Sequence, residues 1–195
     1  MYRYAPRVAP LFLRQPSPRW LSNFGLTHVD KETLAARMVD VSHKVASHRQ
    51  AHARAVVQLP ASMADLLPGP ETAAGRVEIF GKKGPVFSTA IVAGVMAAKR
   101  TAELIPFCHQ VALDDCSIDI AVEERSGGAA EPIRLTVDCR VKTNHRTGVE
   151  MEAMVGASTA ALCVYDMLKA RSHDIQVLSV QLVEKTGGKT TFRRE

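Results

Sequence analysis

The order of elements in this sequence predicts an α+β fold, a ferredoxin-like βαββαβ sandwich with helices packed on one face of an antiparallel sheet. Two stretches place apolar residues three or four positions apart, as amphipathic helices do. Four shorter stretches are apolar or alternate apolar with polar residues, as strands do. Along the chain these stretches follow the order strand, helix, strand, strand, helix, strand.

The first strand is predicted at residues 53–59, where Pro60 closes an apolar run. Prolines and glycines are dense in residues 60–85, so we expect a long loop with one short apolar run at 77–80. The first helix is predicted at 88–105, because its apolar spacing continues until Pro106.

Alternation predicts the next two strands at 118–122 and 133–141, joined as a hairpin by a turn region at Gly127-Gly128. The second helix is predicted from about residue 147 to 170, and the last strand at 175–183. Because both helices cover one face, the other face of the sheet needs cover, and we expect association through the sheet or its edge.

The composition is that of one ordinary soluble globular domain: 195 residues, 46% hydrophobic and 23% charged. No membrane span is predicted, because the longest apolar stretches fall short of the roughly 20 residues that a spanning helix needs. The formal net charge is +5, but four arginines before the first acidic residue, Asp30, account for four of these charges. The nearly neutral remainder has few aromatic residues, so no nucleic-acid partner is expected.

Residues 1–25 are basic, contain no acidic residue, and include scattered aromatic and leucine side chains. This composition favours a mitochondrial transit peptide and a protein of the mitochondrial matrix. Prolines in the segment leave open the alternative of a disordered leader on a cytoplasmic protein. The folded domain is expected at 26–195.

The cysteines Cys108, Cys116, Cys139 and Cys163 show no Cys-x-x-Cys spacing and are predicted to be free thiols. Cys139 and Cys163 lie in apolar patterns and are interpreted as small core residues, whereas Cys108 lies beside His109 and is a candidate for a site. One such pair supplies too few ligands for a metal, so neither a metal nor a cofactor is predicted.

Two clusters of acidic or imidazole side chains are suited to chemistry. His109 follows a helix that a proline stops, where an imidazole can act as acid or base or be structural. Glu150 and Glu152 open the second helix near the positive end of its dipole, where they either serve a site or stabilise the first turn.

Two further clusters contain lysines. Asp166 and Lys169 lie three residues apart near the end of the second helix, as a catalytic pair or as an exposed ion pair. Lys83 and Lys189 lie in glycine-containing segments, where flexible backbone can approach an anion, although neither segment matches the P-loop pattern.

The length of the second helix limits how these clusters combine. Glu152 and Asp166 are 14 residues apart, which corresponds to about 21 Å along one helix. They cannot share a pocket within one chain. If both are catalytic, another subunit must complete the pocket.

Seven segments point together to one family. They are L-T-H-V-D at 26–30, M-V-D-V-S at 38–42, A-G-V-M-A-A-K-R-T at 93–101, L-I-P-F-C-H at 104–109, T-G-V-E-M-E-A at 147–153, Y-D-M at 165–167 and K-T-G-G-K at 185–189. In this order they resemble the MoaC family, the cyclic pyranopterin monophosphate synthases of molybdenum cofactor biosynthesis.

The resemblance implies a ferredoxin-like subunit in a homohexamer, a trimer of dimers with pockets at the dimer interfaces. It implies a lyase that converts (8S)-3′,8-cyclo-7,8-dihydroguanosine 5′-triphosphate into cyclic pyranopterin monophosphate and releases diphosphate. The catalytic residues that it implies are Asp166, Lys169, Lys83 and His109, and the substrate-binding residues are Cys108, His109, Glu150, Met151, Glu152 and Lys189. Asp166 and Lys169 would be the acid/base pair, Lys83 and His109 would contact the substrate and its phosphates, and the glutamates would position it.

The sequence departs from the family pattern at several places. Pro85 stands where an aspartate usually follows Lys-Gly, and Gln110 stands where a proline usually follows Cys-His. Residues 154–156 and 190–191 also differ from the usual motifs. Because Pro85 removes a carboxylate and a backbone donor beside Lys83, the alternative is a non-catalytic member that binds a nucleotide or pterin phosphate without turnover.

Residues 1–25 fused to a fluorescent reporter are expected to carry it into mitochondria, because basic, acid-free leaders act as import signals. Imaging against a mitochondrial dye measures the outcome. A diffuse cytosolic reporter would favour the disordered leader instead.

Overall fold

The computed structural model describes Val29 and residues 35–67, 77–123 and 131–195. It divides the chain into two units, Met1–Val39 and Asp40–Glu195. In the first unit, Val29 and Ala36 form an isolated antiparallel bridge. Every helix and strand named below belongs to the second unit. The predicted leader at 1–25 and the predicted turn at Gly127-Gly128 lie outside the described residues.

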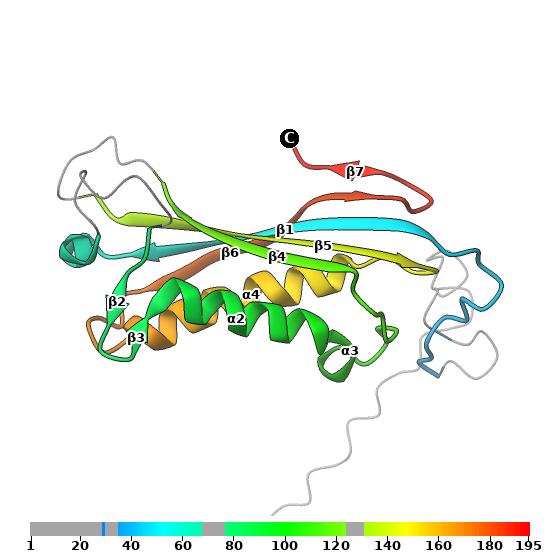
Figure 1. Cartoon of the computed structure of the whole chain (residues 1–195), viewed down its shortest axis with the longest axis horizontal. Helices are drawn as coiled ribbons and strands as arrows, with labels where there is room; N and C mark the ends of the chain where they lie inside the picture. Colours follow the sequence, from blue (N-terminus) through cyan, green and yellow to red (C-terminus); the bar gives the residue numbers. More distant parts are fainter. Residues whose placement is uncertain (1–28, 30–34, 68–76, 124–130) are drawn as a thin grey trace, which may run out of the picture. The chain divides into compact units, whose positions relative to one another are not determined.

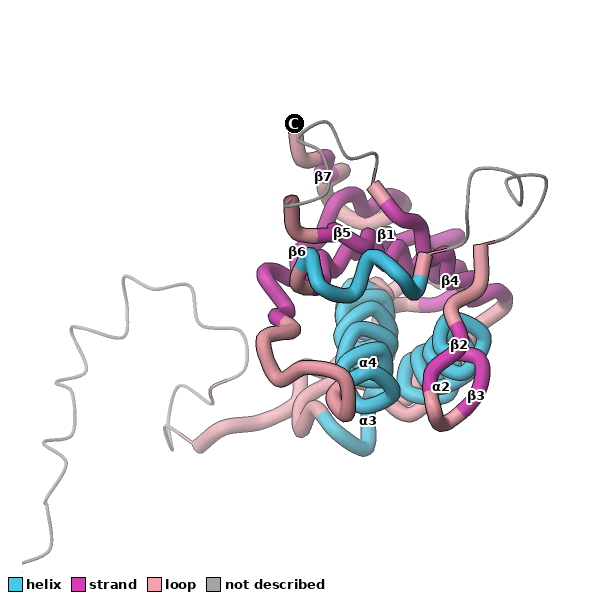
Figure 2. The backbone as a smooth tube through the Cα atoms, turned by 90° about the vertical axis from the view of Figure 1, so that its left-hand side faces the viewer, coloured by secondary structure: helices cyan, strands magenta, loops and turns pink. Residues whose placement is uncertain are grey.

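In the described part of the chain, five antiparallel strands form one sheet in the order β4-β5-β1-β6-β7. They are β1 (Ser47–Leu59), β4 (Asp115–Val122), β5 (Ile133–His145), β6 (Gln176–Thr186) and β7 (Phe192–Arg193). Helices α2 (Val86–Lys99) and α4 (Glu150–Leu168) lie side by side against one face of the sheet (Figures 1 and 2). The predicted α+β, ferredoxin-like architecture is confirmed.

Strand β1 is the centre of the sheet and pairs with β5 on one side and β6 on the other. Its alternate side chains are buried under the helices: Ala51, Ala53, Ala55, Val57 and Leu59. Three of these are alanines, so α4 can lie close to the strand without leaving a void.

The opposite face of the sheet is polar. Arg54 donates hydrogen bonds to both carboxylate oxygens of Asp138, at 2.8 and 2.9 Å, and Nε2 of His52 lies 2.5 Å from the same group. Burial favours a raised pKa for Asp138, but the hydrogen bonds from Arg54 and His52 outweigh it and hold the pKa below its ordinary value. The charges around Asp138 are therefore paired within the chain, and the expected association through the sheet or its edge stays a prediction.

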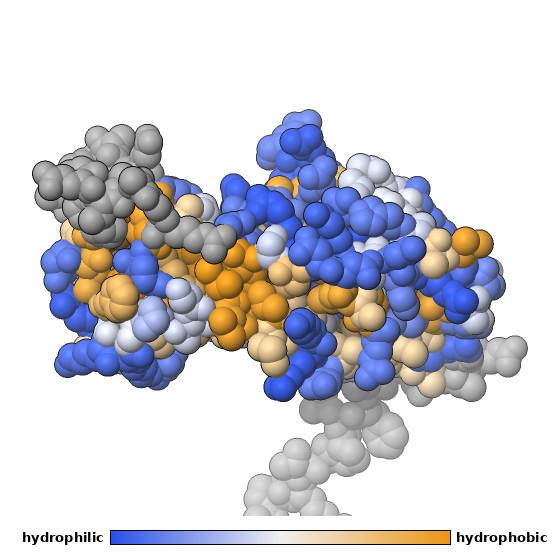
Figure 3. Space-filling model, in the orientation of Figure 1, coloured by the Kyte–Doolittle hydropathy of each residue, from blue (hydrophilic) through white to orange (hydrophobic). Residues whose placement is uncertain are grey.

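The two helices approach closely because glycines lie where they cross. A Cβ atom on Gly94 would lie 2.7 Å from the carbonyl oxygen of Gly156 and 2.4 Å from Cδ1 of Ile118. Only a hydrogen atom fits at this position. The outer side of α2 is different: Val92 and Met96 are exposed, and apolar surface gathers over this helix (Figure 3).

The first predicted helix, 88–105, is two helices rather than one. Arg100 leaves helical geometry with φ −108° and ψ 15°, and α3 (Thr101–Leu104) follows. The buried hydroxyl of Thr101 donates to the carbonyl oxygen of Ala98 at 3.0 Å, in competition with the main-chain bond there. The second helix, predicted at 147–170, is shorter at both ends in the structure: α4 is Glu150–Leu168.

Other element ends also differ from the prediction. β1 begins at Ser47 rather than at residue 53, because polar residues there still pair with β5 as far as His145. The predicted loop 60–85 contains a 3-10 helix, η1 (Ala61–Leu66), and a small hairpin of β2 (Phe80–Gly81) and β3 (Gly84–Pro85). β7 was not predicted, since two residues are too few to show alternation.

All four cysteines lie in described ranges and are free thiols. Cys139 is fully buried in the core, as predicted, whereas Cys163 is only partly buried against it. Among the described helices, none combines the length and apolar character needed to cross a membrane.

Gly94→Ala is expected to destabilise the protein by about 1–3 kcal/mol, because the added methyl group overpacks the contact between α2 and α4. Urea unfolding measures the loss. Val92→Ala is the matched control on the same helix, since that side chain is 64% exposed. Equal unfolding free energies for Gly94→Ala and the wild type would contradict the close packing described above.

Candidate active site

Three of the predicted residues, Lys83, Asp166 and Lys169, meet where α4 ends and form the lysine–aspartate cluster. Lys83, in the turn of the β2–β3 hairpin, donates to Oδ2 of Asp166 at 2.7 Å and to its main-chain oxygen at 3.2 Å. Nζ of Lys169 lies 2.8 Å from Oδ1 of Asp166. The end of one helix therefore supplies two of the groups, and the hairpin adds the third.

The charges in this cluster stabilise one another. Hydrogen bonds from Lys169 and then Lys83 lower the pKa of the Asp166 carboxyl to about 2. The Asp166 carboxylate in turn raises the pKa of Lys169. The side chains are about half exposed, so the cluster presents two ammonium groups and one carboxylate to solvent.

A basic cleft lies at the other end of α4. Glu150 begins the helix, and its Oε1 lies 3.0 Å from Nζ of Lys185 on β6. The adjoining cleft has a volume of about 400 Å³. Its charged lining consists of Lys44, Arg49, Arg146, Lys185 and Lys189, with Glu150 as the acidic member. Lys189, a predicted substrate contact, therefore lies in a strongly basic setting.

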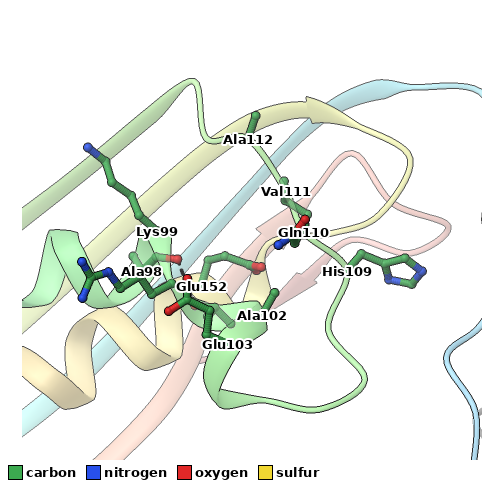
Figure 4. A pocket seen from close by; sticks show the side chains of 11 residues that line it. Ala98, Lys99, Ala102, Glu103, His109, Gln110, Val111, Ala112 and Glu152 are labelled. Atoms are coloured by element: carbon green, nitrogen blue, oxygen red, sulfur yellow. Dashed lines mark hydrogen bonds between the residues drawn. The ribbon is translucent and has the colours of Figure 1, made fainter.

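A second hollow, the Glu152 pocket, lies between the end of α2, α3 and the segment that leads to β4 (Figure 4). Its volume is about 260 Å³, and Glu152, His109 and Gln110 are among the residues that line it. In Figure 4 the ring of His109 points away from the other side chains drawn. Cys108 lies nearby, where burial and the Glu152 carboxylate raise the pKa of its thiol.

Glu152 differs from the other carboxylates of the site because it is buried. The residue is 5% exposed, and this burial, with a contribution from Glu150, raises its pKa to about 7. A carboxyl group with that pKa exchanges protons readily at neutral pH. Met151, between the two glutamates, is instead exposed.

The predicted residues thus fall into two separate groups. Lys83, Asp166 and Lys169 meet at one end of α4, whereas the glutamates, His109 and Lys189 lie toward the other (Figure 1). Helix geometry separates Glu152 from Asp166 by about 21 Å. The structure therefore agrees with the sequence argument that one chain does not bring them together.

Three basic residues of the cleft were not predicted from the sequence: Lys44, Arg49 and Arg146. Arg146 directly precedes the Thr147-Gly148 motif, which was a usable signal. Arg49 comes close only because the start of β1 pairs with the end of β5, which no local pattern reveals. In the described ranges no group of three His, Cys, Asp or Glu residues could hold a metal ion, whereas the basic cleft suits an anion.

Comparison with known proteins identifies the family. A family model described as the MoaC family matches residues 38–188. The chain belongs to the MoaC family. It is 46% identical to a cyclic pyranopterin monophosphate synthase of Thermomicrobium roseum, over 87% of this chain and 93% of that protein. It is also 46% identical to the synthase of Xanthomonas oryzae, over 84% of this chain and 90% of that protein.

Longer relatives of this MoaC chain also exist. A molybdenum cofactor biosynthesis bifunctional protein of Synechocystis is 48% identical over 84% of this chain, which spans 44% of that protein. Molybdenum cofactor biosynthesis protein 1 of Dictyostelium discoideum is 38% identical over 88% of this chain, which spans 28% of that protein. The chain thus covers less than half the length of these two relatives.

Glu152→Gln is expected to stabilise this MoaC chain at pH 8 by up to about 3 kcal/mol and to change little near pH 4.5. The folded pKa of about 7 lies above the ordinary 4.5, so between these values the folded state binds more protons than the unfolded state. The contribution of Glu152 to stability therefore falls as the pH rises, and glutamine removes that loss.

Urea unfolding at the two pH values measures this difference. Glu103→Gln is the control, since Glu103 is an exposed carboxylate that lines the same pocket. A gain for Glu152→Gln that is equal at pH 4.5 and pH 8 would contradict a carboxyl group that titrates near neutrality.

Proposed function

We propose that this chain is a cyclic pyranopterin monophosphate synthase, a lyase of molybdenum cofactor biosynthesis. Its substrate would be (8S)-3′,8-cyclo-7,8-dihydroguanosine 5′-triphosphate, and its products would be cyclic pyranopterin monophosphate and diphosphate. The observation that carries the proposal is the family match over 38–188, which includes the charged residues at both ends of α4.

The basic cleft supports a triphosphate substrate. The cleft is lined by five basic side chains and one acidic side chain, Glu150. The ion pair between Lys185 and Glu150 orients the ammonium group of Lys185. Formation of a cyclic monophosphate makes a bond to the α-phosphorus and breaks its bond to the departing diphosphate. Fixed cations around that diphosphate stabilise the charge that develops on it.

The two ends of α4 suit different proton roles. Asp166, with a pKa of about 2, is a poor proton donor at neutral pH, so its role here is to hold and orient Lys83 and Lys169. Lys83 and Lys169 then supply the two ammonium groups of this cluster, and both are placed to contact phosphate. Glu152, with a pKa of about 7, is the better candidate for accepting and returning protons while the purine ring opens.

Both groups serve one substrate only if two copies of the chain meet. The separation of about 21 Å prevents Glu152 and Lys169 of one copy from sharing a pocket. A homo-oligomer, such as a hexamer built from three dimers, would place the start of α4 from one copy and the end of α4 from another around the same substrate. The composition of residues 1–25 supports the mitochondrial matrix as the location of this oligomer.

The test is incubation of the purified chain with the cyclised nucleotide, with detection of the pterin product and of diphosphate. Lys169→Ala and His109→Ala are expected to lose at least about 100-fold in kcat while the fold is retained. A chain that binds the nucleotide and releases no diphosphate would instead be the non-catalytic binding member.

Mixing Glu152→Ala chains with Lys169→Ala chains, after dissociation and reassembly, is expected to restore part of the activity. Random pairing leaves some interfaces with one pocket that contains both intact residues, while the other pocket carries both changes. Reassembly of each variant with itself is the control. Mixed oligomers as inactive as either parent would rule out the shared pocket.

A further inference from the structure

Helix α2 begins without a capping side chain of its own. Its N-cap residue is Pro85, and no side-chain hydrogen bond caps the helix from that position. Proline has neither a side-chain acceptor nor a backbone N–H. The first N–H groups of a helix have no partner within the helix, so they need acceptors from elsewhere.

Glu78 supplies most of these acceptors from a distant position. Its Oε1 accepts the N–H of Phe87 at 2.8 Å, and its Oε2 accepts the N–H of Ser88 at 3.0 Å and its hydroxyl at 2.6 Å. The N–H of Ile79 also donates to Oε1, at 2.9 Å. The remaining N–H of the first turn, that of Val86, donates to the carbonyl oxygen of Ile79 at 2.8 Å.

The carboxylate is ionised for this role. Burial alone would raise the pKa of Glu78, but hydrogen bonds from the Ser88 hydroxyl and from the backbone of Phe87, Ser88 and Ile79 outweigh it and lower the pKa. An anion at the positive end of the helix dipole adds to these bonds.

The segment that Glu78 closes carries Lys83. Residues 79–86 form the β2–β3 hairpin and lead into α2. Both ends of this segment lie at the Glu78 carboxylate, which accepts from Ile79 before the hairpin and from Phe87 after it. Ile79 is fully buried at the base of this hairpin. A Cβ atom on Gly81 would lie 3.2 Å from the carbonyl oxygen of Met167, so the hairpin backbone packs directly against the end of α4.

We propose that Glu78 is a positioning residue for the reaction: by capping α2 it fixes the base of the hairpin, and this holds Lys83 at Asp166. The hairpin is then attached at two points, through Glu78 at its base and through Lys83 at its turn. Lys83 is half exposed, and its contacts with Asp166 alone do not fix a flexible side chain on a free hairpin. The inference rests on the proposed function and adds a residue to it.

The first test is hydrogen exchange, which needs no activity. Glu78→Ala is expected to speed exchange of the Phe87 and Ser88 amides and of the hairpin amides about tenfold, whereas amides of β1 and β5 keep their wild-type rates. Asp65→Ala is the control, since it removes an exposed carboxylate that binds Arg171. Wild-type exchange at residues 79–88 in Glu78→Ala would overturn the proposal.

The second test is kinetic. Glu78→Ala is expected to lower kcat about 100-fold, the loss that a shift of about 1 Å in a catalytic group can cause, and to change KM less. Glu78→Gln keeps one acceptor oxygen and places an amide N–H toward the N–H donors, so an intermediate loss is expected. Asp65→Ala is expected to keep wild-type kinetics.

The third test moves the cap to another residue. Pro85→Asp in the Glu78→Ala background gives α2 an N-cap carboxylate of its own, and it is expected to recover slow exchange at Phe87 and Ser88 and most of kcat. Recovery of exchange without recovery of kcat would show that the cap is only structural and would overturn the proposal. A wild-type chain without synthase activity would count against the proposed function, while the exchange measurements would still decide whether Glu78 holds the hairpin.

Discussion

Helices α2 and α4 meet where Gly94 faces the backbone of Gly156. This contact fixes which residues of one helix lie opposite which residues of the other. The start of α2 is joined to the hairpin with Lys83, and its end leads through α3 to His109. The start of α4 carries Glu150 and Glu152, and its end carries Asp166. Because the two helices lie side by side and touch at this crossing, one packing contact places the hairpin that carries Lys83 beside the end of α4, and the segment with α3 beside its start (Figure 1).

The two ends differ in electrostatics because they differ in burial. Asp166 is half exposed and has two lysine partners, so its charge is stabilised and its pKa is low. Glu152 is buried close to Glu150, so its charged form is disfavoured and its pKa rises to about 7. A side-chain carboxyl group is therefore a permanent anion at Asp166 and a proton-exchanging group at Glu152.

Local patterns in the sequence predicted the helices, most strands and the pair Asp166–Lys169, because helical spacing alone brings those two residues together. They did not predict that Lys83 joins the pair, since that depends on how the hairpin packs on α4. Glu150 and Glu152 look alike in sequence, and only the tertiary fold buries one of them. Glu78 was not predicted as a cap, because the amides that it accepts in α2 lie 9 and 10 residues later in the chain. A capping residue is normally sought next to its helix.

The polar outer face of the sheet has a consequence for recognition. Asp138, Arg54 and His52 already satisfy one another there, so a molecule that docks on this face must exchange existing hydrogen bonds for new ones instead of releasing water from apolar surface. Such contacts gain little affinity per unit area but discriminate sharply between partners. Their strength also falls as salt is added. Around Asp138, the sheet therefore offers a partner charged groups that are already paired rather than apolar surface.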